Sequence, residues 1–86
     1  MFRCQYTETF KRTYQRLTIA EQEAVKRAIE KLSQNPGHPS LRVKKMKGRV
    51  GVWEARASRD LRLTFAWDGD EIILRVCGHH DPALKR

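Results

Sequence analysis

The hydrophobic period of the sequence changes once, at the Asn-Pro-Gly stop of residues 35–37, and this change constrains the fold more than any other feature. Before it, apolar residues recur every three or four positions, first over 10–17 and then over 24–32, as on amphipathic helices. After it, apolar and polar residues alternate, which is the period of strands. Helices followed by a run of strands predict an α+β domain with the helices on one face of the sheet.

Capping residues set the limits of the two expected helices. Thr7 is suited to cap the first, with Glu8 in the first turn, where the helix dipole favours an acid. Thr18 and Glu21 have the spacing of a capping box, which starts the second helix. Because the connection at Thr18 is short, we expect the two helices to form an antiparallel hairpin. Before them, residues 2–6 alternate as a short strand does.

The second half of the chain predicts three antiparallel strands. They span 52–57, 61–67 and 71–77, and the last two are joined by an Asp-Gly turn at 68–70. With 86 residues the chain has room for one domain. We therefore expect residues 1–86 to fold as a single β-α-α-β-β-β domain, in which a helical hairpin packs on one face of a small, curved, mainly antiparallel sheet. The other face of the sheet stays open for function.

Alternation predicts which side chains reach that open face. Leu61, Leu63 and Phe65 should face the helices, as should Ile72, Leu74 and Val76 on the following strand, and Trp53 is the expected core residue of the first. The open face should then carry Arg62, Thr64, Arg75 and at least one of Glu54 and Arg56.

The charge of the chain is concentrated in its middle. The net charge is +8, and residues 36–62 carry eight basic side chains against two acidic ones, a net +6. Such an excess favours a polyanionic partner, most simply nucleic acid, although acidic proteins and membrane surfaces also fit. No apolar run approaches the length of a membrane span, and the first twelve residues lack a signal-peptide stretch.

The cysteines and histidines favour neither a disulfide framework nor a metal centre. Cys4 and Cys77 lie 73 residues apart, which suggests a reduced, cytoplasmic protein. His79 and His80 are adjacent, but no second Cys or His lies at a chelating spacing from Cys4, and zinc sites need three or four ligands. We therefore expect no metal, no small-molecule cofactor and no membrane partner.

The whole chain resembles the RelE/ParE superfamily, the toxins of type II toxin–antitoxin systems. The order of elements carries the resemblance, together with Gly-Val-Trp at 51–53, Leu-Arg-Leu-Thr-Phe at 61–65 and Val-Cys-Gly-His-His-Asp at 76–81. RelE-type members cleave messenger RNA in the ribosomal A site, whereas ParE-type members share the fold and inhibit DNA gyrase. The resemblance implies a cognate antitoxin, the ribosome and mRNA as partners.

The same resemblance implies roles for individual residues. Arg62 matches the arginine that binds the scissile phosphate, and His80 matches the proton donor two residues past Gly78. Glu54 and Arg56 match residues that assist the base or bind phosphate. A further set of basic residues would hold the RNA backbone, namely Lys44, Lys45, Lys47, Arg49 and Arg75, with His79 as another contact. Many members stack a C-terminal tyrosine on a base, and residues 82–86 contain no aromatic side chain.

Metal-independent cleavage of RNA needs three functions. A base removes the 2′-OH proton, a cation stabilises the charge that builds on the phosphate, and an acid protonates the leaving 5′ oxygen. Glu54, Arg62 and His80 are of the right types. Each also has a structural alternative: Glu54 could pair with Arg56 or Arg62, Arg62 with Asp60 or Glu71, and His80 could cap the last strand. A gyrase-binding toxin and an RNA-binding homologue with weak activity remain the competing functions.

Overall fold

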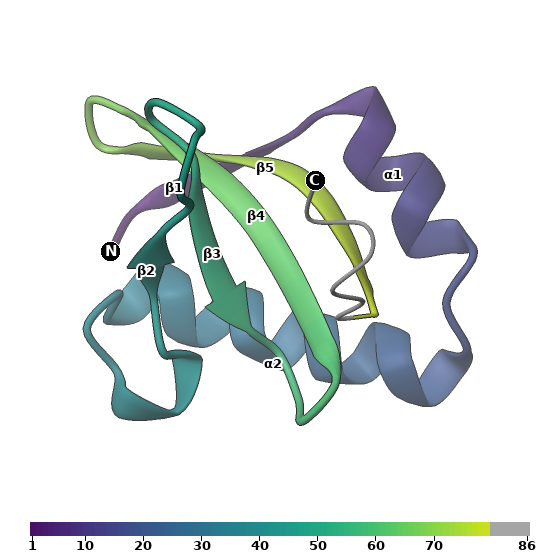
Figure 1. Cartoon of the computed structure of the whole chain (residues 1–86). Coiled ribbons are helices and arrows are strands. Elements are labelled where there is room, and N and C mark those ends of the chain that lie inside the picture. Colours follow the sequence, from purple (N-terminus) through teal and green to yellow (C-terminus); the bar gives the residue numbers. More distant parts are fainter. Residues whose placement is uncertain (80–86) are drawn as a thin grey trace.

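A computed structural model describes residues 1–79 of the chain (Figure 1). The elements are β1 (Arg3–Tyr6), α1 (Glu8–Gln15), α2 (Ile19–Gln34), a 3-10 helix η1 (Pro39–Leu41), β2 (Lys44–Lys45), β3 (Trp53–Arg56), β4 (Leu61–Asp68) and β5 (Glu71–His79). The five strands form one sheet in the order β1-β5-β4-β3-β2, with β1 parallel to β5 and the other neighbours antiparallel. The predicted α+β class, with two helices packed on a mainly antiparallel sheet, is confirmed.

The helices begin where the capping residues predict. The Thr7 side chain accepts a hydrogen bond from the backbone N–H of Phe10 at the start of α1. At the start of α2, Thr18 and Glu21 form both hydrogen bonds of the capping box. Each cap satisfies backbone N–H groups that have no partner within the helix, so the sequence fixes both starting points locally.

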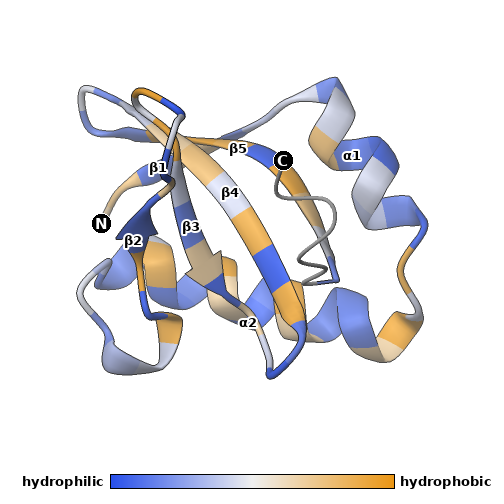
Figure 2. Cartoon of the chain, viewed as in Figure 1, coloured by the Kyte–Doolittle hydropathy of each residue, from blue (hydrophilic) through white to orange (hydrophobic). Residues whose placement is uncertain are grey.

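One hydrophobic core lies between the helices and the sheet. It contains Phe10 of α1, the apolar stripe of α2, and the inward residues of β3, β4 and β5. Along β4, buried and half-buried residues alternate from Leu61 to Ala66, and Phe65 is fully enclosed. The alternating orange and blue bands along the strands in Figure 2 follow this pattern. The prediction for β4 is therefore confirmed, and Arg62 and Thr64 lie on the face opposite the core.

Three expectations about the sheet were wrong. The two-residue strand β2 was not anticipated, because Lys44 and Lys45 have no strand pattern of their own and pair only through β3. Val76 is exposed and Cys77 is buried, the reverse of the predicted order. The reason is a register shift: Phe65 pairs with Leu74 and Thr64 with Val76, which leaves one extra residue in β5. Trp53 is half-buried at the edge of the core, and the small Ala55 is the fully buried residue of β3.

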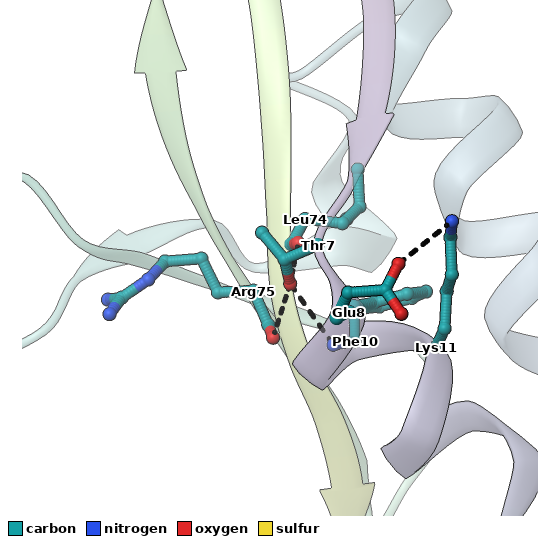
Figure 3. A network of polar contacts seen from close by, with 6 residues as sticks. All are labelled: Thr7, Glu8, Phe10, Lys11, Leu74 and Arg75. Atoms are coloured by element: carbon teal, nitrogen blue, oxygen red, sulfur yellow. Dashed lines mark hydrogen bonds and ion pairs between the residues drawn. The ribbon is translucent and has the colours of Figure 1, made fainter.

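Threonine side chains fix α1 against this irregular part of β5. The Thr7 hydroxyl donates to the carbonyl oxygens of Leu74 and Arg75, at 2.9 and 3.1 Å, while it caps α1 (Figure 3). Six residues later, the Thr13 hydroxyl donates to the Phe10 carbonyl and accepts from the Cys77 backbone N–H. Backbone groups beside the bulge are thereby satisfied from α1, as burial requires.

Candidate nucleic-acid interface

The antiparallel register of β2, β3 and β4 aligns four charged residues on the open face. Lys44 lies opposite Glu54 across β2 and β3, and Arg56 lies opposite Arg62 across β3 and β4. Glu54 and Arg56 are two residues apart in one strand, so both point to the same face. These residues come from three segments of the chain, and the sheet brings them together.

They line one cavity of about 200 Å³, whose lining residues are Arg42, Lys44, Glu54, Arg56 and Arg62. We call it the β3–β4 cavity. Four of its five residues are basic and one is acidic. Three of the four residues expected to be catalytic from the sequence, Glu54, Arg56 and Arg62, therefore share one concave site.

The two arginines are held side by side at the turn between β3 and β4. The Ser58 carbonyl accepts from Arg56 Nε at 3.2 Å and from Arg62 Nη1 at 3.0 Å. Arg62 Nη1 also donates to the Arg59 carbonyl at 3.0 Å. Like charges directly opposite each other in a sheet are destabilising, so this pairing weakens the fold unless an anion is bound. Arg62 forms no ion pair with Asp60 or Glu71, which the sequence offered as the structural alternative to phosphate binding.

Glu54 is the one charged side chain among residues 1–79 that is buried, with 6% of its surface exposed. Its Oε1 lies 3.8 Å from Nζ of Lys44. A buried carboxylate needs an ionic or hydrogen-bonding partner, and Lys44 supplies it here in place of the predicted Arg56 or Arg62. This buried carboxylate lines the same cavity as Arg56 and Arg62.

A second cavity of about 210 Å³ lies on the same face, towards α1. It is lined by Thr7, Thr9, Arg49, Thr64, Arg75 and Val76. Thr64 lies directly opposite Glu54, so the cavity adjoins the β3–β4 cavity across one strand pair. Arg49 and Arg75, both expected to bind RNA, are thus brought together although they are 26 positions apart.

The lysines of the middle segment do not act as one group. Lys45 follows Lys44 in β2 and pairs with Trp53, so it lies on the other side of the strand. Its ammonium group is 5.5 Å from the centre of the Trp53 ring, a cation–π contact. Lys47 is exposed in the loop between β2 and β3. Lys44 alone of the three contributes to the β3–β4 cavity.

The end of β5 contacts α2 on the helix side of the sheet, because His79 lies opposite the buried Leu61 and two residues after the buried Cys77. His79 Nε2 is 2.6 Å from Oε2 of Glu21, whose other oxygen completes the capping box with Thr18. The hydrogen bond from the Thr18 backbone N–H, aided by the nearby His79, lowers the pKa of the Glu21 carboxyl below its ordinary value of 4.5. His79 therefore contacts α2, and its expected contact with RNA stays a prediction. His80, the expected proton donor, lies outside the described residues.

Sequence reasoning missed Arg42 as a site residue. It ends η1 with φ 46° and ψ 48°, a left-handed conformation that is uncommon for residues other than glycine. This backbone turns the chain into β2 and brings Arg42 to the β3–β4 cavity. No sequence signal marks a left-handed arginine, so only the structure reveals it.

Other features of residues 1–79 bear on the class of protein. No helix there is long and apolar enough to cross a membrane, and no group of three or more His, Cys, Asp or Glu side chains is placed to hold a metal ion. Cys4 and Cys77 are free thiols. A groove of about 530 Å³ separates α1 from α2 and is lined chiefly by aromatic and aliphatic groups, including Tyr6, Phe10, Tyr14 and Ile29.

The chain is a small α+β domain, with two helices packed on a mixed five-stranded sheet and basic residues on the open face. Solved structures with the same fold show which proteins it is similar to. No protein-family model matches the chain, and no curated protein sequence matches it. Three solved structures illustrate the similarity. A copper-bound mutant toxin from Helicobacter pylori is 21% identical, with a TM-score of 0.77 over 93% of this chain and 96% of that one.

The other two structures bear the names RelE and ParE, which are those of the superfamily that the sequence resembles. RelE in an antitoxin–toxin complex with RelB from Methanococcus jannaschii is 23% identical, with a TM-score of 0.70 over 86% of this chain and 87% of that one. A YoeB/ParE toxin from Agrobacterium tumefaciens is 19% identical, with a TM-score of 0.74 over 92% and 99%. The chain therefore has the fold of the RelE, YoeB and ParE toxins, and the resemblance seen in the sequence is confirmed at the level of the fold.

Proposed function

We propose that this chain is the toxin of a type II toxin–antitoxin system, and that it cleaves mRNA in the ribosomal A site as a metal-independent endoribonuclease. The observation that supports the proposal is the β3–β4 cavity. A buried carboxylate, Glu54, lies there with Arg56 and Arg62, which are directly opposite each other in the sheet. Metal-independent RNA cleavage needs a base beside a group of cations that holds a phosphate.

In the proposed reaction each of these residues has a separate role. Glu54 removes the proton from the ribose 2′-OH, whose oxygen attacks the adjacent phosphorus. Arg62 and Arg56 stabilise the negative charge that develops on the phosphate oxygens, because guanidinium groups bind two oxygens at once. His80 protonates the 5′ oxygen as its bond to phosphorus breaks. The products are a 2′,3′-cyclic phosphate and a 5′-hydroxyl. Glu54 gains the proton of the 2′-OH and His80 gives one to the 5′ oxygen, so the number of protons is balanced.

A cognate antitoxin is the proposed protein partner. Several structures of the same fold are complexes of toxin with antitoxin, among them RelE with RelB and YoeB with YefM. For this chain, an acidic and amphipathic antitoxin would complement the +8 charge and cover the helices. We place the activity in the cytoplasm, where ribosomes and mRNA are found and where Cys4 and Cys77 stay reduced.

A ParE-like toxin that binds gyrase without catalysis is the second candidate. It is favoured by the similarity to the Agrobacterium tumefaciens structure, whose description carries both the YoeB and the ParE names. Such a protein needs a complementary surface but no base beside a phosphate site. A homologue that binds RNA with weak activity would keep the arginines and lose cleavage.

Primer extension on a translated message separates these candidates. Wild-type protein should cut within codons only when ribosomes are present. Arg62→Ala, Glu54→Gln and His80→Ala should abolish the cuts, whereas Lys26→Ala, in the groove between α1 and α2, should leave them unchanged. Growth arrest with intact messages would overturn the nuclease proposal, and inhibition of gyrase supercoiling by the same protein would establish the second candidate.

A further inference from the structure

The β3–β4 cavity is one of two basic hollows that share an arginine. The other, of about 220 Å³, lies between α2 and the turn after β3, and we call it the α2–turn cavity. Its basic lining residues are Arg27, Lys31, Arg56 and Arg59. Arg56 lines both cavities. The two cavities meet at the edge of β3. Strand β2 pairs only with Trp53 and Glu54, so Arg56 has no strand partner on that side.

The shape of the α2–turn cavity follows from small side chains. Ala24 and Ala28 are one turn apart on α2 and face Ala57 across the hollow. Short residues at these positions leave space that larger apolar residues would fill. Arg27 and Lys31 stand beside this space, four positions apart on the same face of α2.

The cations of this cavity have no anionic partner within residues 1–79. No carboxylate lines it, and none of its four basic side chains belongs to an ion pair among the described residues. The Lys31 ammonium instead contacts the Ser40 hydroxyl at 3.4 Å. Like charges four positions apart on a helix repel each other, so a bound anion would relieve the repulsion between Arg27 and Lys31.

From this arrangement we propose that the α2–turn cavity is a second phosphate site, which holds the RNA backbone next to the nucleotides in the β3–β4 cavity. Because the two cavities share Arg56, one continuous strand can occupy both, passing around the edge of β3. Together they present seven basic side chains and one acidic side chain, the composition expected of a track for a polyanion. The inference rests on RNA being the ligand of the proposed function, but it does not depend on cleavage.

The test measures binding of RNA that has no nucleophile. Fluorescein-labelled oligouridylates of 3 and 12 nucleotides, methylated at every 2′ oxygen, are titrated with the full chain and followed by fluorescence anisotropy at several salt concentrations. The variant is Arg27→Gln with Lys31→Gln. The control is Lys11→Gln with Lys26→Gln, which removes the same charge from the groove between α1 and α2, whose lining shares no residue with the basic cavities.

The proposal predicts that the cavity variant binds the 12-nucleotide RNA on the order of tenfold more weakly than wild type at moderate salt. The slope of log K against log salt is negative and should become less steep by about 1.4, since each lost phosphate contact of a single strand contributes about 0.7 to its magnitude. The 3-nucleotide RNA can occupy either cavity, so the cavity variant should weaken its binding less than that of the 12-nucleotide RNA, which the proposal places in both. The control should stay within about twofold for both lengths.

Equal effects of the cavity variant and the control would overturn the proposal, as would wild-type protein that does not bind the long RNA. Loss of binding to a 12-residue polyglutamate with RNA binding intact would assign the cavity to an acidic protein instead. If the binding pattern holds while primer extension shows no cleavage, the nuclease proposal fails and the second phosphate site stands.

Discussion

Replacing Thr7 by alanine tests whether one hydroxyl joins α1 to the irregular part of β5. The Thr7 hydroxyl accepts from the Phe10 N–H and donates to the carbonyls of Leu74 and Arg75 (Figure 3). Loss of an N-cap costs about 1 kcal/mol. The bond to β5 from a half-buried group contributes about 1 kcal/mol more. We therefore expect Thr7→Ala to lower the free energy of unfolding by about 2 kcal/mol.

Urea denaturation, followed by the fluorescence of Trp53 and Trp67, measures this loss. In a domain of this size 1 kcal/mol corresponds to about 4–8 °C in Tm, so the thermal midpoint should fall by roughly 8–16 °C. Thr7→Ser keeps the hydroxyl and should retain most of the stability. Thr9→Ala, on the exposed side of the same helix, should change it by less than about 0.5 kcal/mol. A loss at Thr7→Ala no larger than that of Thr7→Ser would refute the reasoning.

Two further predictions concern titratable groups. Because the pKa of Glu21 is lowered in the folded state, its carboxylate stabilises the fold above pH 4.5, and this contribution disappears as the pH falls through the folded pKa. Glu21→Gln keeps the capping box but should lose this dependence of stability on pH. The urea midpoints of variant and wild type should therefore converge as the pH falls from 6 to 3. A gap that stays constant over this range would contradict the assignment. Burial raises the pKa of both thiols, and Cys77 is the more enclosed. Ellman's reagent should therefore modify Cys4 faster than Cys77 in native protein, and equal rates would show that the Cys77 side of the core opens readily.

The faces of β3 and β4 could be predicted because alternation is a local property. Arg62 follows Leu61 and precedes Leu63, and in any register an arginine between two buried leucines points away from the core. For β3 the sequence predicted only that at least one of Glu54 and Arg56 would reach the open face, and both do. Part of the candidate site was therefore readable from the spacing of apolar residues.

The opposite outcome occurs at β5, where alternation fails. The sequence from Ile72 to Val76 continues the pattern of buried residues, yet the bulge exposes Val76 and buries Cys77. The bulge is stabilised by Thr7 and Thr13 from α1, more than 60 positions away in the sequence. No local pattern contains that information.

By itself the sequence determined the order of the two α-helices and of four of the five strands among the described residues, the starting points of both helices and the sign of the charge on the open face. Caps, turns and hydrophobic periods act over a few residues, so they can be read without the fold. Only the tertiary structure decided which charges meet: the pairing of Lys44 with Glu54, the placing of Arg42, and the sharing of Arg56 between two cavities. Those contacts depend on strand register and on the packing of α2 against the β3–β4 turn, which arise from interactions between segments distant in the chain.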